Sequence, residues 1–260
     1  MTSEFGPEQA VHGQSWSQVH GGYFSDPAVA RPLIEALGRV WKQARADVVV
    51  DLGGGTGFLL AQLQASGMAP GARLVNLDGS ETQLEAARVP GIELLRGSVE
   101  SFRRAAVVPA GRRALFLMRS VLHYAGKAGL AAVLSHLRAQ VEPSEYWVHQ
   151  TACFADGRDA DCLNALYARM HTRKWYPTVA NLQKRLRTAG WRIEAIHSAP
   201  TLRLESGELG VRYSLSTPGL RHIAEEMVAA YGVKSSVWRA DARGFQADLH
   251  YHIFICRAGS

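Results

Sequence analysis

The sequence has no run of about 18 apolar residues, and it shows none of the spacings that mark a metal site or a disulfide scaffold. Its opening stretch, Met1 to Gly13, is polar and has no basic flank followed by an apolar segment. We therefore expect neither a membrane-spanning helix nor a signal peptide. The three cysteines are odd in number and lack Cys-x-x-Cys spacing, which favours reduced thiols. These absences predict a cytoplasmic protein without a metal.

The chain also lacks internal repeats, low-complexity tracts and any linker long enough to separate two domains. Its 260 residues, of which 47% are hydrophobic and 20% charged, can bury a sizeable core. We therefore expect one domain over residues 1–260.

Acidic residues are fewer than basic ones, which gives a formal net charge of +6. A basic surface can bind nucleic acid because lysine and arginine neutralise phosphates. Here the densest basic groups are short and scattered, at residues 103–104, 112–113, 169–174 and 184–187. We do not expect a nucleic-acid partner, although net charge alone leaves one open.

Short aliphatic or β-branched runs alternate with helical patterns, which is typical of a parallel sheet built from β-α-β units. The predicted strands are residues 47–51, 73–78, 92–96, 114–118, 146–151, 192–198 and 247–256. Asp26 and Pro27 predict an N-cap and a first helical turn. Ser80 with Gln83 predicts a capping box for a second helix. Later helices are predicted at residues 159–171, 178–189 and 220–231.

A glycine-rich turn follows the first predicted strand. The strand ends in Asp51 and runs directly into Gly53, Gly54, Gly55, Thr56 and Gly57. Glycines allow a tight turn and let a ligand approach the backbone without a Cβ in the way. A further carboxylate, Asp78, ends the next strand, where it can accept hydrogen bonds from both ribose hydroxyls of a nucleoside.

The order Asp-x-Gly-x-Gly-x-Gly resembles motif I of class I S-adenosylmethionine-dependent methyltransferases more than the Gly-x-Gly-x-x-Gly of NAD enzymes. The segment from Asp78 to Arg88 is similar to the second strand and following helix of that superfamily. The resemblance implies S-adenosylmethionine as cofactor and S-adenosylhomocysteine as product. The cofactor-binding residues that it implies are Asp51, Gly53, Gly54, Gly55, Thr56 and Gly57 for the methionine portion, Asp78 and Gly79 for the ribose, Ser98 and Val99 for the adenine, and Arg119, Ser120 and Tyr23 around them.

The segment that ends the fourth strand is similar to that of small-molecule O-methyltransferases, whose catalytic base is a histidine at the position of His123. Histidine suits this role because its unperturbed pKa lies near neutrality. Two departures stand out: Tyr124 replaces an acidic residue, and Ser144-Glu145 replaces a glycine pair. The alternative for His123 is that it orients the substrate or closes the cofactor pocket.

The resemblance implies a Rossmann-like α/β fold: a seven-stranded, mostly parallel sheet with helices on both faces, an antiparallel last strand and helical lid insertions. We divide the domain into an N-terminal helical cap (1–45), a cofactor-binding core (46–152) and acceptor-side helices with the last strands (153–260). Residues 201–242 form an insertion that we expect to fold over the acceptor side. His250 and His252 share one face of the last predicted strand, and we interpret them as packing or surface residues.

The predicted function is methyl transfer from S-adenosylmethionine to a small-molecule acceptor, at a hydroxyl because of His123. Two alternatives stay open at this point: an RNA or protein methyltransferase, or a protein that binds S-adenosylmethionine without methyl transfer. The protein is expected to be a monomer or a homodimer.

Overall fold

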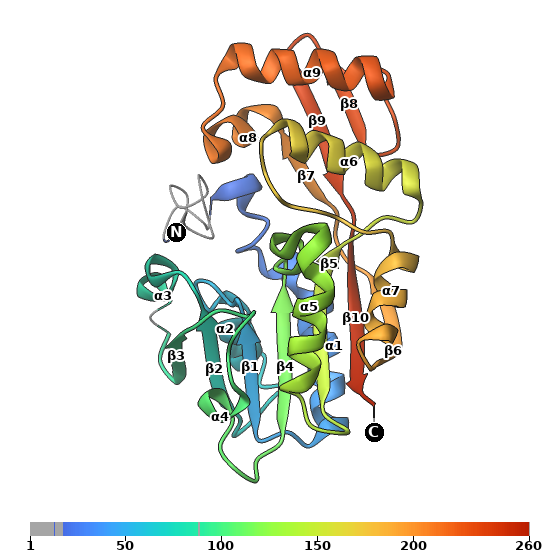
Figure 1. Ribbon diagram of the computed structural model, residues 1–260. Helices are drawn as coiled ribbons and strands as arrows, with labels where there is room; N and C mark the ends of the chain where they lie inside the picture. Colours follow the sequence, from blue (N-terminus) through green and yellow to red (C-terminus); the bar gives the residue numbers. More distant parts are fainter. Residues whose placement is uncertain (1–12, 14–17, 88, 260) are drawn as a thin grey trace.

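The computed structural model describes residues 13, 18–87 and 89–259. Seven strands form one sheet in the order β3-β2-β1-β4-β5-β10-β6 (Figure 1). Their bounds are β1 (Val48–Leu52), β2 (Arg73–Asp78), β3 (Ile92–Arg96), β4 (Ala114–Arg119), β5 (Tyr146–Ala152), β6 (Trp191–Ser198) and β10 (Tyr251–Ala258). β1 to β5 pair in parallel, whereas β10 runs antiparallel to both β5 and β6. This is the predicted mostly parallel sheet with an antiparallel last strand.

Every residue of β1, β4 and β5 is buried, because helices cover both faces of the sheet. One face packs on α1 (Pro27–Ala44) and α2 (Phe58–Ala65). The other face packs on α4 (Arg104–Val107), α5 (Gly126–Ala139) and α7 (Val179–Thr188). The continuous aliphatic runs of the central strands are thus explained by burial on two sides.

Both predicted N-caps are present, but the predicted capping box is only half formed, because the Ser80 amide donates to Asp78 and the Gln83 side-chain oxygen accepts from the Gly13 amide. The Asp26 carboxylate accepts a hydrogen bond from the Ala28 amide at 2.7 Å, and Pro27 occupies the first turn of α1. The Ser80 hydroxyl accepts a bond from the Gln83 amide at 3.4 Å at the start of α3 (Glu81–Ala86). The two caps fix where α1 and α3 begin, next to the carboxyl ends of the strands.

A second layer lies above the carboxyl ends of the parallel strands (Figure 1). It contains α6 (Gly157–Arg169), α8 (Ser206–Tyr213), α9 (Thr217–Tyr231) and an antiparallel sheet, β7-β9-β8. The three strands of this sheet are β7 (Leu202–Glu205), β8 (Trp238–Asp241) and β9 (Gly244–Leu249). A separate apolar cluster holds these elements together. This layer is therefore mixed α/β: the sequence patterns indicated α6 and α9 within it, but not α8, β7 or β8.

The prediction of one strand over residues 247–256 is wrong. The chain breaks at His250 into β9 and β10, which belong to different sheets. The break is stabilised because the Cys153 amide donates a hydrogen bond to the His250 carbonyl at 2.9 Å. Consequently His250 lies outside both strands and no longer shares a strand face with His252. Apolar residues occur on both sides of His250, in β9 and in β10, so the sequence pattern resembled one continuous strand.

Within the described residues, no helix has the length and apolar character needed to cross a membrane.

Candidate cofactor and acceptor site

A pocket opens at the carboxyl ends of β1, β2 and β4, where parallel sheets commonly bind ligands. All the predicted cofactor residues line it except Gly57 and Tyr23. The lining residues that the sequence patterns missed are Phe24, Phe58, Leu59, Gln83, Glu100, Val121, Leu122, Tyr124, Ala125 and Val133. Most of these are apolar and belong to helices or loops whose contacts no motif specifies.

The glycine turn after β1 leaves no room for side chains. A Cβ on Gly54 would collide with the side-chain oxygen of Asn76 and would lie 2.7 Å from Cγ of Asp51. Gly53, Gly55 and the N-cap Gly57 all have positive φ angles, which glycine adopts at little cost. The backbone can therefore approach a ligand closely along this turn.

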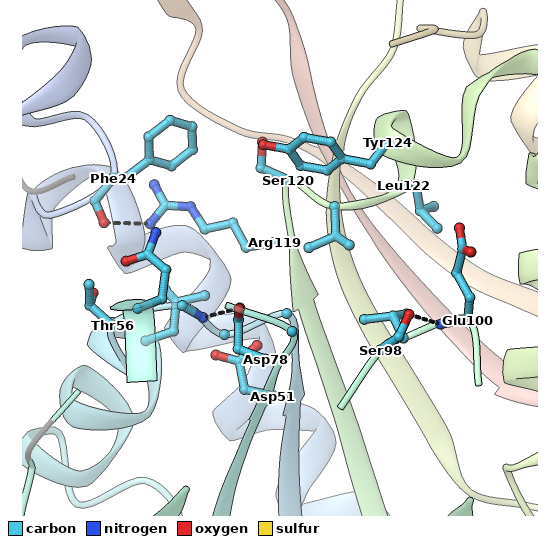
Figure 2. A pocket seen from close by; sticks show the side chains of 18 of the residues that line it. Phe24, Asp51, Thr56, Asp78, Ser98, Glu100, Arg119, Ser120, Leu122 and Tyr124 are labelled. Atoms are coloured by element: carbon cyan, nitrogen blue, oxygen red, sulfur yellow. Dashed lines mark hydrogen bonds between the residues drawn. The ribbon is translucent and has the colours of Figure 1, made fainter. Parts of the chain in front are cut away.

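Asp78 ends β2 and is fixed by backbone donors (Figure 2). One carboxylate oxygen accepts a hydrogen bond from the Gly55 amide at 2.8 Å, and the other accepts one from the Ser80 amide at 2.7 Å. Both oxygens lie on a residue that lines the pocket, and a carboxylate oxygen can accept more than one hydrogen bond. This arrangement fits the two hydroxyls of a ribose.

Asp51 lies at the floor of the pocket and is fully buried. Neither of its carboxylate oxygens has a hydrogen-bond partner among the described residues. Burial, and next the negative charge of Asp78, raise its pKa to about 8, against the attraction of Arg119. A buried carboxyl group of this kind is stabilised in its charged form when a cation enters the pocket.

Arg119 ends β4 and connects the pocket to the segment before α1. Its guanidinium donates to the carbonyl oxygens of Tyr23 at 3.1 Å and Phe24 at 3.4 Å (Figure 2). It also lies 5.4 Å and 5.3 Å from the centroids of the same two rings. Nε has no partner among the described residues, and burial lowers the pKa of the group. Arg119 is thus a nearly buried cation whose Nε–H has no partner among the described residues.

Tyr23 lies behind the pocket wall, where its carbonyl and its ring both contact Arg119. The ring also stacks on Tyr251 at 5.7 Å, and the hydroxyl donates to the Pro200 carbonyl. Phe24, the next residue, is the one that lines the pocket.

Ser120 has a φ of 60°, in the left-handed region that non-glycine residues rarely adopt. Its amide donates to the Gln150 carbonyl at 2.9 Å, and its hydroxyl is 2.6 Å from the Tyr251 hydroxyl. These bonds hold the strained turn that follows β4 and keep the Ser120 side chain at the pocket.

The predicted base, His123, lies in a short 3-10 helix, η4 (Leu122–Ala125). Its ring is buried and lies 4.3 Å from the ring of Tyr124 and 5.3 Å from that of Tyr176. Leu122 and Tyr124 line the pocket, whereas His123 does not. His123 therefore lies behind the Tyr124 ring and does not itself line the pocket.

The opposite end of the pocket is formed by Ser98, Val99 and Glu100 (Figure 2). The Ser98 hydroxyl accepts a hydrogen bond from the Glu100 amide at 3.2 Å, which turns the chain around this end. The exposed Glu100 carboxylate was not among the predicted residues. It adds an acidic group two residues beyond Ser98, at the same end of the pocket.

The residues present fit S-adenosylmethionine. A buried carboxyl group without a partner matches a ligand with a sulfonium and an ammonium group. The collision of a Cβ on Gly54 with its neighbours shows that the turn is shaped for backbone approach. Across the described part of the chain, no cluster of three or more metal-ligating side chains occurs.

Residues 25–196, well over half of the chain, match the model of a methyltransferase domain family. The chain therefore belongs to this family. It is a class I S-adenosylmethionine-dependent methyltransferase with a Rossmann-like fold. No curated protein matches the sequence.

Solved structures with this fold share little sequence with the chain. The YcgJ protein of Bacillus subtilis has a TM-score of 0.62 and 11% identity, over 87% of this chain and 99% of that one. An O-methyltransferase family protein of Burkholderia thailandensis has a TM-score of 0.55 and 16% identity, over 90% of this chain and 57% of that one. The mitomycin 7-O-methyltransferase MmcR has a TM-score of 0.54 and 15% identity, over 89% of this chain and 54% of that one. The chain spans little more than half the length of these two O-methyltransferases, and the likeness shows the fold alone.

Proposed function

We propose that this methyltransferase transfers the methyl group of S-adenosylmethionine to a hydroxyl oxygen of a small-molecule acceptor. The observation that carries the proposal is the position of the second layer. The layer built by α6, α8, α9 and the small sheet lies above the carboxyl ends of the parallel strands, the end of the sheet where the pocket opens, although none of its residues lines the pocket (Figure 1). An added layer at this end of the sheet suits a compact acceptor better than a folded RNA or protein. Distant O-methyltransferases with the same fold support this assignment.

The acceptor end of the pocket supports the same proposal. It combines the rings of Phe24 and Tyr124 with the hydroxyl of Ser120 (Figure 2). Two rings and a single small polar group suit an acceptor that presents an apolar ring and one reactive hydroxyl.

The proposed cofactor-binding residues divide the pocket by chemistry. Asp51 compensates the positive groups of the cofactor, and Arg119 is placed to hold its carboxylate. The turn from Gly53 to Gly57, with Thr56, surrounds the methionine portion. Asp78 and Gly79 hold the ribose, Ser98 and Val99 border the adenine, and Ser120 and Tyr23 shape the wall beside Arg119.

When bound, S-adenosylmethionine would supply an electrophilic methyl group on its sulfonium, with S-adenosylhomocysteine as the leaving group. The chain's own residues then have two tasks: to align the acceptor oxygen with that methyl and to take its proton. We propose His123 as the base. Its imidazole lies directly beside the Tyr124 ring, and base geometry commonly tightens only in the substrate complex.

Calorimetric titration with S-adenosylmethionine and S-adenosylhomocysteine tests the cofactor site first. Micromolar binding should weaken at least about tenfold in Asp78→Ala, because the ribose hydroxyls lose their acceptor. Ser144→Ala, at an exposed turn away from the pocket, is the matched control and should bind as the wild type does. Unchanged binding in Asp78→Ala would remove the ribose assignment.

A methylation assay with labelled cofactor tests the acceptor class. Phenols, aliphatic alcohols, amines, total RNA and a protein extract should be compared, with transfer to a hydroxyl compound expected. His123→Ala should lower kcat for that acceptor by about 100-fold while leaving cofactor binding intact. Label entering RNA or protein in place of small molecules would overturn the proposal, and binding without transfer to any class would point to a protein that does not methylate.

A further inference from the structure

We infer that Tyr124 is the side chain that contacts the acceptor's reacting hydroxyl, and that Lys174 is a positioning residue that acts through the Tyr124 ring. This inference rests on the proposed function and deepens it. Tyr124 stands at the position where the resembling O-methyltransferases have an acidic residue.

The first step is the direction of the side chains after β4. η4 is a 3-10 helix, in which neighbouring residues point about 120° apart. His123 and Tyr124 therefore cannot face the pocket together, and Tyr124 is the one that lines it. Its hydroxyl points toward Ser120, above Asp51 and Asp78 in the view of Figure 2. A phenol at this place can both donate and accept a hydrogen bond.

The second step is how the Tyr124 ring is held. Nζ of Lys174 lies 4.6 Å from its centroid, close enough for a cation-π contact, and the His123 ring lies 4.3 Å away. A pocket ring packed by an ammonium group and an imidazole has few orientations open to it. The hydroxyl is therefore presented at one place, which is what a positioning interaction requires.

The third step is what holds Lys174. The lysine is 9% exposed, and its ammonium donates to the Tyr213 hydroxyl of α8 at 2.9 Å. The same nitrogen lies 5.4 Å from the ring centroid of Tyr213 and 5.8 Å from that of Tyr167 in α6. Lys174 thus connects the Tyr124 ring to two helices of the covering layer. A buried ammonium group costs free energy unless it is compensated. The hydrogen bond to Tyr213 and the three aromatic rings provide that compensation for Lys174.

The fourth step is the loop that carries Lys174 onto η4. The Trp175 amide donates to the His123 carbonyl at 3.2 Å. A Cβ on Gly126 would lie 2.9 Å from the Arg173 carbonyl, so the residue that follows η4 has to be small. These two contacts fix the distance between the lysine and the ring, independently of the side chains themselves.

The chemical role of Tyr124 keeps the reaction balanced. Its hydroxyl hydrogen-bonds the acceptor oxygen and directs a lone pair toward the methyl group. The bond from oxygen to the methyl forms while the bond from sulfur breaks, and the acceptor proton passes to the base. Tyr124 is neither consumed nor oxidised, so no further reactant is needed.

Steady-state kinetics with a hydroxyl acceptor test the inference. Tyr124→Phe keeps the ring and removes only the hydroxyl, so it should fold and should lower kcat/KM for the acceptor about tenfold. Lys174→Met removes the charge at similar volume and should lower it about fivefold. The dissociation constant of S-adenosylmethionine should stay within about twofold in both, because neither group is assigned to the cofactor.

The double variant distinguishes positioning from packing. Since Lys174 acts through the Tyr124 hydroxyl, adding Lys174→Met to Tyr124→Phe should cause no loss beyond about twofold. If the lysine merely supports the fold, the two losses should multiply instead, and its role would be overturned. Tyr231→Phe in α9 and Lys184→Met, an exposed residue of α7, are the matched controls and should keep wild-type kinetics.

The outcomes separate this inference from the proposed function. A wild-type enzyme that methylates a hydroxyl compound, with unchanged kcat and KM in Tyr124→Phe, overturns the inference and leaves the proposed function standing. A wild-type enzyme that methylates no hydroxyl compound overturns both. If Lys174→Met lowers the unfolding temperature strongly, Lys174→Arg, which retains the cation over the ring, replaces it and should retain most of the activity.

Discussion

The negative charge of Asp78 helps to raise the pKa of Asp51 to about 8, although Asp51 lies near the end of β1 and Asp78 ends β2. Asp78 is held by two backbone amides, whereas Asp51 has no hydrogen-bond partner in the described part of the chain. The two carboxylates therefore have different roles: Asp78 is held as an acceptor of hydrogen bonds, and the charge of Asp51 responds to the charge of the ligand.

Cofactor binding should become tighter as pH rises toward about 8. Below that value Asp51 is mostly protonated in the free protein, and the cations of the cofactor favour its charged form. Binding must then release a proton, which weakens it by up to tenfold per pH unit below the pKa. Calorimetry at about pH 6 and about pH 9, in two buffers with different ionisation enthalpies, measures both the affinity and the proton. Equal affinity at the two values would refute the assignment of Asp51.

Asp51→Asn should stabilise the protein without ligand and weaken cofactor binding at the same time. The folded-state pKa of Asp51 lies above its ordinary value of 3.8, so its stability contribution is complete at acid pH and is lost as pH rises through about 8. A neutral amide avoids that loss. The unfolding temperature should rise by about 3 °C at pH near 8, and the difference should vanish near pH 4. Thermal unfolding at both pH values checks the sign.

Gly54→Ala should abolish cofactor binding, with a loss of at least about 100-fold. The added Cβ would overlap the side chains of Asn76 and Asp51, so the turn must move away from the strand that supports it. Gly157→Ala is the matched control, because a Cβ there meets nothing within 4 Å and the residue begins α6. Titration of both variants with S-adenosylhomocysteine makes the comparison. Normal binding by Gly54→Ala would show that the turn tolerates displacement.

Arg119→Lys should loosen the segment that covers the pocket. The guanidinium bonds two successive carbonyl groups, Tyr23 and Phe24, and a lysine cannot reproduce that fork. Hydrogen exchange of the amides in residues 22–26 should accelerate, and cofactor affinity should fall about tenfold. Arg203→Lys, which changes an exposed pair with Asp248, serves as the control. Unaltered exchange in the Arg119 variant would mean that the segment is held by its ring contacts alone.

The sequence was informative wherever a local rule decides the structure. The glycine turn, Asp78 at the end of β2 and the caps Asp26 and Ser80 follow from backbone geometry and short-range hydrogen bonds, so motif and spacing located them. The parallel strands were legible because burial on both faces demands continuous apolar runs.

What the sequence could not predict depends on distant segments. The break at His250 is stabilised by a bond to Cys153, nearly a hundred residues away in the chain, and local alternation carries no trace of it. Lys174 contacts Tyr124 and Tyr213 only after η4, α8 and the loop that follows α6 have packed together. His123 was selected by position after a strand, but a 3-10 turn decides which neighbour faces the pocket.

Glu145, one of the departures from the O-methyltransferase pattern, should matter for stability and not for binding. Its buried carboxylate accepts bonds from the Arg104 guanidinium at 2.6 Å and 2.8 Å and from the Ala114 amide at 2.6 Å. It precedes β5, at the end of the sheet opposite the pocket. Glu145→Ala leaves the Arg104 guanidinium with only the exposed Glu142 carboxylate and the Ala114 amide without its acceptor, and it should lower the free energy of unfolding by about 3 kcal/mol.

Urea unfolding and cofactor titration of the same Glu145→Ala preparation check both halves of this prediction. The affinity for S-adenosylmethionine should remain within about twofold of wild type, because no pocket residue contacts the pair. Glu81→Gln removes an exposed bond to Arg96 and should cost less than about 1 kcal/mol, which calibrates the effect of burial. A Glu145 variant as stable as wild type would show that relaxation compensates the exposed guanidinium, whereas a weakened cofactor site would show that the two ends of the sheet are coupled.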